Sequence, residues 1–363
     1  MLNAKENLRE ALKPDGHPDR FVNSYEFIRT AFGPNFLMRN LPNPGELDKV
    51  TDWGVHYSFP IGTPGPFPLD TPDKVLIADI DEWRDILKAP PTQYPDELWN
   101  ISQAMMDEID GEKCFKACFV APGLFENLHA FCGITDALVY LMTDEDEVKE
   151  LLKYVTEWEL RVAEQLCSRL HPDAILHHDD WGSEQNSFMR PEMFAEFFVE
   201  PYKEIYGYYH DHGVELIVHH NDSYGANLVP YMIEMGIDIW QGCMRSNDVP
   251  TLVDRYKGEI AFMGNIDNKQ VDFDGWQEED CEKAARLAVE GMDPHSYIPC
   301  ITQGIPGSVY PGTYRRLVKY LDQCNSERFG HSVEDLQAAR DELQVLEYEL
   351  ELIMPDQAER NKH

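Results

Sequence analysis

The sequence has few basic residues and lacks long apolar runs. Its 363 residues hold 31 Lys and Arg against 66 Asp and Glu, which gives a formal net charge of −35. A surface of this charge repels phosphate backbones and anionic headgroups, so nucleic acid and membranes are not expected partners. It fits a highly soluble protein, and it would equally steer a basic partner or a cationic substrate. No apolar run reaches the roughly eighteen residues of a membrane span, and the N-terminus has no apolar signal core.

The cysteines lack the spacing of a disulfide framework, and no Cys-x-x-Cys pair occurs. They are scattered through predicted helices and strands, at positions 114, 118, 132, 167, 243, 281, 300 and 324. This pattern is typical of a reduced protein, so we expect a cytoplasmic location.

Low hydrophobicity, the usual sign of disorder, is also absent. Hydrophobic residues make up 43% of the chain and aromatic residues 11%, which is enough for a large packed core. The chain is longer than a typical single domain, but α/β barrels with additional N-terminal elements reach this length as one unit.

From Lys113 onward, short β-branched or aromatic runs alternate with longer stretches of helical periodicity, which is the pattern of βα units on a parallel sheet. The predicted strands are 114–120, 173–179, 214–219, 237–241, 259–264 and 297–302. The predicted helices between them include 191–211, 226–235, 248–257, 275–290 and 311–325.

The N-terminal third is irregular and rich in Pro and Gly. We predict helices at 3–12 and 23–32, and we assign the two strands still missing from an eight-stranded barrel to 35–38 and 73–77. The expected fold is an α/β (β/α)8 TIM barrel with an irregular N-terminal extension and an extra C-terminal helix. The expected parts are an extension over 1–112 that contributes the first elements, the main barrel over 113–330, and a helix and tail over 331–363.

The C-terminal tail is predicted to form one charged helix over 332–353. Its apolar side carries Leu336, Leu343, Leu346, Leu350 and Ile353. Packing on the barrel or across a homodimer interface would bury this side.

Polar side chains follow five successive predicted strands, at the end of a parallel barrel where active sites lie. The strands end in His177-His178-Asp179-Asp180-Trp181-Gly182, His219-His220-Asn221-Asp222, Trp240-Gln241-Gly242-Cys243, Gly264-Asn265-Ile266-Asp267 and Thr302-Gln303-Gly304. A single Asp or Asn here often caps the next helix. Two strands that both end in His-His with an acid two residues later are harder to explain in that way, and they favour an active site.

Alternate residues of a strand face the same side, so His178 pairs with Asp180, and His220 with Asp222. A His-x-Asp pair with a third ligand from another strand would hold a divalent metal such as Zn²⁺ and leave a position open for substrate. Alternatively, the carboxylates would act as general acid and base without a metal.

These segments and several others, in the same order, resemble the uroporphyrinogen decarboxylase superfamily, which contains the haem-pathway decarboxylase and the cobalamin-dependent methyltransferases. The matching stretches are 4–12, 52–55, Pro122-Gly123-Leu124-Phe125-Glu126, 179–182 with 191–194, His220-Asn221-Asp222 with 228–230, 264–267 and 304–306.

The resemblance implies different chemistry for the two branches. True decarboxylases carry paired N-terminal arginines that grip the substrate's carboxylates; here residues 36–41 keep Arg39 and lack the second arginine. The thiol-methylating members bind zinc through His-x-Cys and a later Cys, which correspond to His220, Asp222 and Gln303. Oxygen ligands in place of sulfur make a metal site more Lewis-acidic, which suits an ether or alcohol oxygen better than a thiolate.

The resemblance therefore implies a methyltransferase, in particular an O-demethylase component, that moves a methyl group from a small methylated or methoxylated aromatic donor to cobalamin. The chain lacks the Asp-x-His-x-x-Gly segment of a corrinoid-binding domain, so a separate corrinoid protein would be the partner. The alternatives are a metal-free, decarboxylase-like lyase acting on a small carboxylated substrate, and a barrel that only binds a ligand.

We assign roles to the strand-end residues on this hypothesis. The expected catalytic residues are His220, Asp222, Asp180 and His178. The expected metal ligands, for Zn²⁺, are His220, Asp222 and Gln303. The expected substrate-binding residues are Trp181, Tyr224, Trp240, Gln241 and Asn265.

Overall fold

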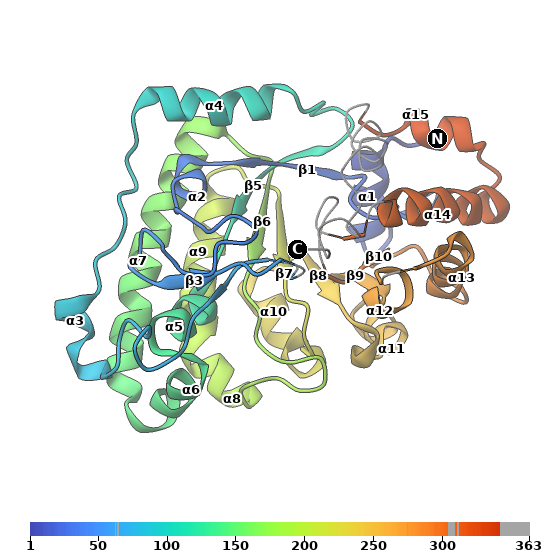
Figure 1. Cartoon of the computed structure of the whole chain (residues 1–363). Helices are drawn as coiled ribbons and strands as arrows, with labels where there is room; N and C mark the ends of the chain where they lie inside the picture. Colours follow the sequence, from blue (N-terminus) through green and yellow to red (C-terminus); the bar gives the residue numbers. More distant parts are fainter. Residues whose placement is uncertain (62, 64, 274, 304–308, 311, 342–363) are drawn as a thin grey trace.

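A curled parallel sheet of seven strands forms the centre of the molecule (Figure 1). The computed structural model describes residues 1–61, 63, 65–273, 275–303, 309–310 and 312–341. In spatial order the strands are β1 (Ile28–Phe32), β5 (Phe115–Val120), β6 (Ala174–His178), β7 (Leu216–His220), β8 (Ile239–Cys243), β9 (Ala261–Ile266) and β10 (Tyr297–Ile301). All neighbouring pairs are parallel.

The six strands predicted from Lys113 onward are confirmed. Their residues are almost continuously buried, as expected for parallel strands that are covered on both faces. Within the described residues, however, the main sheet has seven strands rather than eight. The fold is therefore TIM-barrel-like, and no β1–β10 ladder closes it in this part of the chain.

Helices follow the strands and cover the sheet (Figure 1). After β5 come α5 (Leu124–Cys132), α6 (Ile134–Thr143) and α7 (Glu145–Leu170); after β6 come α8 (Pro191–Phe194), the π-helical η2 (Ala195–Val199) and α9 (Glu200–Asp211); after β7 come η3 (Ala226–Leu228) and α10 (Val229–Met235); after β8 come η4 (Arg245–Asn247) and α11 (Val249–Tyr256); after β9 come α12 (Asn268–Val271) and α13 (Glu278–Val289); after β10 come α14 (Thr313–Phe329) and α15 (Val333–Ala338). The predicted helices after β6 to β10 are confirmed. None of the described helices is both long and apolar enough to cross a membrane.

The N-terminal third differs most from the prediction. Besides α1 (Ala4–Leu12), which was predicted, it contains α2 (Pro34–Leu37), η1 (Ile80–Glu82), α3 (Trp83–Ile86), α4 (Asp96–Asp107) and a small antiparallel sheet of β2 (Lys49–Val50), β3 (His56–Ser58) and β4 (Phe67–Pro68). The predicted helix over 23–32 is wrong, because its second half is β1, which pairs with β5. The strands predicted at 35–38 and 73–77 are also wrong. Pro34 begins a short helix at the first of these positions, where its fixed backbone angle is favourable.

The C-terminal prediction is tested only in part. Helix α15 covers Val333–Ala338, and Leu336 is buried. The remainder of the predicted helix, with Leu343, Leu346, Leu350 and Ile353, lies outside the described residues.

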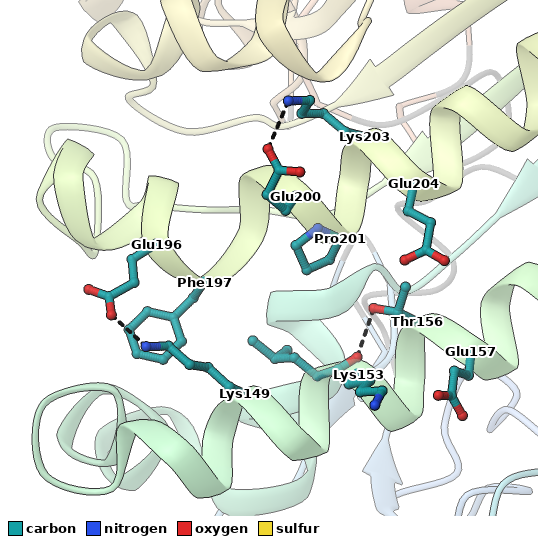
Figure 2. A pocket seen from close by; sticks show the side chains of 11 residues that line it. Lys149, Lys153, Thr156, Glu157, Glu196, Phe197, Glu200, Pro201, Lys203 and Glu204 are labelled. Atoms are coloured by element: carbon teal, nitrogen blue, oxygen red, sulfur yellow. Dashed lines mark hydrogen bonds and ion pairs between the residues drawn. The ribbon is translucent and has the colours of Figure 1, made fainter.

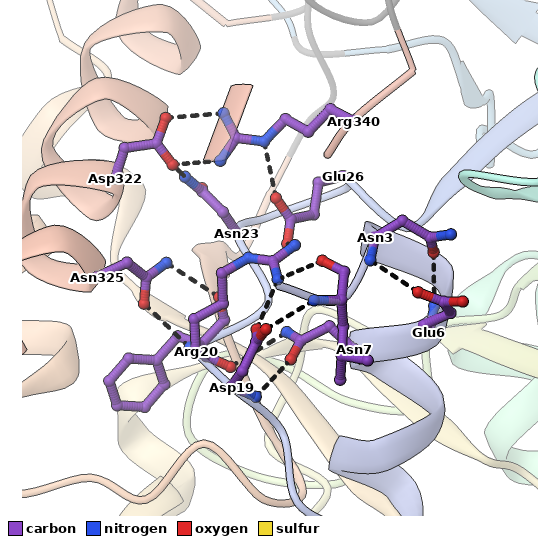
Figure 3. A network of polar contacts seen from close by, with 12 residues as sticks. Asn3, Glu6, Asn7, Asp19, Arg20, Asn23, Glu26, Asp322, Asn325 and Arg340 are labelled. Carbon is purple, nitrogen blue, oxygen red and sulfur yellow. Dashed lines mark hydrogen bonds and ion pairs between the residues drawn. The ribbon is translucent and has the colours of Figure 1, made fainter. Parts of the chain in front are cut away.

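Buried side chains join the two edges of the sheet (Figure 3). Arg340 donates from Nε to Glu26 at 2.7 Å and from Nη1 to Asp322 at 2.7 Å. Asn23 donates to the same Asp322 at 2.8 Å. These contacts tie the segment before β1 to α14 and to the chain after α15. We call this network of Asn23, Glu26, Asp322 and Arg340 the seam.

Helix α1 lies across the amino-terminal ends of the strands. Lys5 forms a 2.8 Å ion pair with Asp173, which precedes β6, and Arg9 forms one of 2.6 Å with Glu215, which precedes β7. With this end covered, the carboxyl ends of the strands are left for the site.

Candidate active site

The paired histidines at the ends of β6 and β7 divide into two layers. His178 and His220 belong to a front layer, and His177 and His219 belong to a back layer. The strands pair in register, His177 with His219 and His178 with His220. Side chains alternate along a strand. Consequently His177 and His219 are fully buried against the helices, whereas the side chains of His178 and His220 are 30% and 12% exposed.

Asp180 and Asp222 lie next to His178 and His220, so the front layer contains all four predicted catalytic residues. The Nε2 atom of His220 lies 3.9 Å from Oδ1 of Asp180 and 3.8 Å from Oδ2 of Asp222. The backbone N–H of Asp222 donates to Asp180 at 2.8 Å. The rings of His178 and His220 stack with their centroids 4.3 Å apart. Their catalytic role stays a prediction, but the strand-end pattern did identify side chains that are neighbours in space.

Three front-layer residues have the geometry to hold a metal ion. One ligand atom from each of His178, Asp180 and His220 lies within 4.8 Å of the other two. Two imidazoles and one carboxylate form a donor set that binds Zn²⁺ or Fe²⁺ at catalytic sites with open positions. This set shares only His220 with the predicted ligands. Asp222 lies beside the cluster and accepts a side-chain hydrogen bond from Gln303.

The charges of the front layer are unbalanced toward the negative. Burial raises the pKa of Asp222 from 3.8 to about 8, and repulsion from Asp180 adds to this effect. Burial lowers the pKa of His178, but attraction from Glu126 and the hydrogen bond to it outweigh burial and raise that pKa to about 10. Burial and the neighbouring His178 lower the pKa of His220. A divalent cation would neutralise this excess of carboxylates.

Glu126 is a site residue that the strand-end argument missed. Its Oε2 atom lies 2.9 Å from Nδ1 of His178. It stands in the first turn of α5, where Asp179 accepts hydrogen bonds from the backbone N–H groups of Phe125 at 3.0 Å and Glu126 at 2.7 Å. A glutamate in a first turn is favoured in any helix, so its sequence position alone carried no functional signal.

The back layer is a continuous chain of buried polar contacts. Nε2 of His177 lies 2.7 Å from Glu159, and Nδ1 of His177 lies 3.2 Å from the hydroxyl of Tyr206. The same hydroxyl lies 2.7 Å from Nδ1 of His219, whose Nε2 lies 3.2 Å from the carbonyl of Asp179. The four side chains, Glu159, His177, Tyr206 and His219, are all buried. The chain links α7 and α9 to the two strands that carry the front layer.

Two of the predicted substrate-binding residues are core residues in this structure. Trp181 and Trp240 have no exposed surface. The indole N–H of Trp181 donates to the carboxylate of Asp179 at 2.8 Å, and that of Trp240 to the carbonyl of Asn221 at 2.8 Å. Because both rings are covered, they support the strand ends from behind and offer no wall to a ligand in the mouth.

The other three predicted substrate-binding residues lie at different depths. Gln241 is buried and its Oε1 contacts Nδ1 of His220. Asn265 is buried as well, and it donates to the hydroxyl of Tyr297 at 3.2 Å. Tyr224 is half-buried. A substrate-binding role stays a prediction for these residues, and Tyr224 is the one with exposed surface.

The cysteines closest to the strand ends are core residues as well. Burial raises the pKa of the Cys300 thiol to about 12 and that of Cys243 well above its usual range. Sγ of Cys300 lies 3.9 Å from the hydroxyl of Tyr314. Neither thiol is prepared to become a thiolate ligand.

A surface groove on the outside of the barrel, between α7 and α9, is a different kind of feature (Figure 2). Lys149 forms a 2.6 Å ion pair across it with Glu196, and Lys203 forms one of 2.7 Å with Glu200. Paired surface charges of this kind are typical of a solvated boundary between helices. The strand ends remain the candidate site.

Comparison with known proteins gives a family and a fold. The sequence model described as uroporphyrinogen decarboxylase (URO-D) matches residues 119–324, more than half of the chain and all of the front layer. A methyltransferase from Methanosarcina mazei is 14% identical and has a TM-score of 0.65, over 89% of this chain and 99% of its own. This likeness shows a shared fold. No curated protein sequence matches significantly.

Two further solved structures are less similar. A D-allulose 3-epimerase from Methylomonas sp. has a TM-score of 0.33 at 11% identity, over 68% of this chain and 81% of its own. A double mutant of the Cellulomonas fimi endo-beta-1,4-mannanase has a TM-score of 0.38 at 14% identity, over 72% of this chain and 65% of its own.

Proposed function

Because the chain belongs to the uroporphyrinogen decarboxylase family, we propose that it is a methyltransferase that moves a methyl group from a small methylated donor to a corrinoid carried by a partner protein. A methoxylated aromatic compound is the donor we favour. The shared fold of the Methanosarcina mazei methyltransferase supports this reading. The observation that carries it is the cluster of ligand atoms from His178, Asp180 and His220 at the strand ends.

The front layer fits a divalent metal ion such as Zn²⁺. The Nδ1 atoms of His178 and His220 face acceptor oxygens of Glu126 and Gln241, so each ring would bind a metal ion through Nε2. His178, whose pKa is raised, would release a proton from that atom when the ion binds. Asp180 adds a carboxylate. When bound, the ion would supply a Lewis acid that polarises the leaving oxygen of the donor.

The remaining residues of the front layer would orient the donor. Asp222 and its partner Gln303 lie beside the proposed ligands, where they can hydrogen-bond a donor oxygen. A donor bound through its oxygen would leave its methyl group free for transfer to the corrinoid of the partner protein. The contribution of the chain is positioning and leaving-group activation.

A metal-free lyase acting on a small carboxylated substrate is the second candidate. It is favoured by the 2.9 Å contact between Nδ1 of His178 and Glu126, which raises the pKa of His178, because a protonated imidazole would bind a carboxylate directly. The two candidates differ in their need for metal.

Metal analysis and a methyl-transfer assay test the proposal together. We expect the purified chain to hold one equivalent of a divalent metal and to form methylcobalamin from added cob(I)alamin and a methoxyarene. The His220→Ala variant should lose both properties. The Lys203→Ala variant, changed in the outer groove, should keep both. A wild-type chain without metal and without methyl transfer from any methoxyarene would refute the proposal.

A further inference from the structure

The two front-layer histidines are each held at Nδ1 by a second side chain. Oε2 of Glu126, from α5, lies 2.9 Å from Nδ1 of His178. Oε1 of Gln241, from β8, contacts Nδ1 of His220. Carboxylate and amide oxygens only accept hydrogen bonds, so the hydrogen in each contact belongs to Nδ1. In the neutral ring that hydrogen leaves the lone pair on Nε2, the atom that faces Asp180 and Asp222 in His220. In His178 a bound metal ion would take the place of the second proton, the one on Nε2.

Both holding residues are themselves fixed in place. The backbone N–H of Glu126 donates to Asp179 at 2.7 Å, and Asp179 also accepts from the backbone of Phe125. Gln241 is buried, and its Nε2 has no hydrogen-bond partner among the described residues. An unpaired buried N–H₂ group costs free energy, and the contact of Oε1 with His220 is the hydrogen bond that the Gln241 side chain makes among the described residues.

The two contacts differ in charge. A carboxylate accepts the Nδ1 hydrogen more strongly than an amide does, which makes the opposite ring nitrogen a better electron donor. His178 is paired with an anion and His220 with a neutral group, although the two rings stack on each other at the same strand level.

We propose that Glu126 and Gln241 are positioning residues that fix the Nδ1-protonated form of the two histidines, and that their unequal charge makes His178 the stronger and His220 the weaker ligand. This inference rests on the metal site of the proposed function. It adds which side chains control each ligand and in which direction.

Reciprocal charge exchange tests the inference without assaying methyl transfer. The variants Glu126→Gln and Gln241→Glu keep the size of each side chain; the first removes a negative charge and the second adds one. Affinity of the metal-free full chain for Zn²⁺ and Co²⁺ is measured by competition with a chromophoric chelator. We expect Glu126→Gln to weaken binding about 10- to 100-fold, Gln241→Glu to strengthen it, and the double variant to return toward the wild type. The Co²⁺ absorption bands should shift in opposite directions in the two single variants.

The control is Glu159→Gln, the same change at a buried carboxylate that contacts His177 in the back layer. It should leave metal affinity and the Co²⁺ spectrum unchanged. Equal weakening in both exchange variants would mean that the residues only pack, and the inference would be overturned. No effect in either variant would overturn it as well.

Ring nitrogen chemical shifts separate this inference from the proposed function. Long-range ¹H–¹⁵N spectra of the chain should show hydrogen on Nδ1 of both His178 and His220, with or without metal. An unprotonated Nδ1 on either ring would overturn the inference even if metal binds. A chain that binds no divalent ion but keeps both Nδ1 hydrogens would refute the metal site of the proposed function; the claim of unequal ligand strength would fail with it, and the tautomer assignment would stand.

Discussion

The imidazole rings of His178 and His220 stack with 4.3 Å between their centroids and 21° between their planes. Two protonated rings at this distance would repel each other, so at most one of them carries a charge easily. The neighbouring Glu126 assigns that charge to His178, because burial and the His178 cation both lower the pKa of His220. A charged and a neutral imidazole thus share one site in the metal-free protein.

The contribution of Asp222 to the stability of the metal-free protein should fall as pH rises. Its pKa is raised from 3.8 to about 8, chiefly by burial and then by Asp180. Between these values the folded state binds a proton that the unfolded state has lost, so the free energy of unfolding decreases with pH. The Asp222→Asn variant has no carboxyl group at this position, so its side chain stays neutral over the whole pH range. In urea titrations from about pH 4 to about pH 9, it should gain stability relative to the wild type as pH increases; parallel curves would contradict the assignment.

Tyr206 should contribute strongly to stability through the back layer. The change Tyr206→Phe removes the hydroxyl that contacts Nδ1 of both His177 and His219, and it leaves two buried polar atoms without a partner. We expect a loss of about 1–3 kcal/mol in the free energy of unfolding. Tyr209→Phe is the matched control in the same helix, because the buried Tyr209 hydroxyl has no hydrogen-bond partner among the described residues. That change should be neutral or slightly stabilising, and equal losses would argue against the role of Tyr206.

Gly123 should resist substitution because it lies against the back of the site. A Cβ atom there would stand 2.5 Å from both Cβ of Asp179 and the hydroxyl of Tyr202. The Gly123→Ala variant should therefore lose about 1–3 kcal/mol of stability through overpacking. A Cβ atom at Gly207, in the middle of α9, would meet nothing within 4 Å. Gly207→Ala should add about 0.5–1 kcal/mol, since alanine is the better helix former. Thermal unfolding of the two variants should move in opposite directions.

Arg340, which is buried in the seam, should contribute far more to the free energy of unfolding than Arg286, which lies on the surface. Arg340→Met leaves the buried carboxylates of Glu26 and Asp322 short of a partner, which should cost about 3–5 kcal/mol. Arg286 also contacts two carboxylates, Glu282 and Glu327, but its side chain is 43% exposed. Arg286→Met should cost about 1 kcal/mol or less. Chemical denaturation compares the two variants. Similar losses in the free energy of unfolding would show that the buried ion pairs of the seam contribute no more than those on the surface.

The sequence predicted the later strands well because their apolar runs are nearly continuous. It failed at β1, because Tyr25, Ile28 and Phe32 follow one another at spacings of three and four residues, which also fit a helix. Pairing with β5 decides the outcome there, and pairing is a long-range property that a local pattern does not contain.

The site could likewise be predicted only as far as local sequence patterns determine it. Strand-end position identified His178, Asp180, His220 and Asp222 as neighbours, since parallel strands deliver their last residues to one rim. It could not tell that the side chain of Trp181 turns to the back layer, where it stacks on His219. The strand-end pattern could not predict Glu126 for another reason. This residue lies on helix α5, and its position depends on the capping contact with Asp179, which forms only in the folded sheet.

The position of β7 within the sheet relates the seam to the site. This strand has three strands on either side, so the chain places His220 as far from the two sheet edges as the topology permits. No pairing of β1 with β10 is described, so the buried side chains of the seam help to hold these two edges of the sheet together. A disturbance at the seam would therefore have to pass through the intervening strands before it reached the pairing of β6 with β7, which keeps the stacked histidines in register.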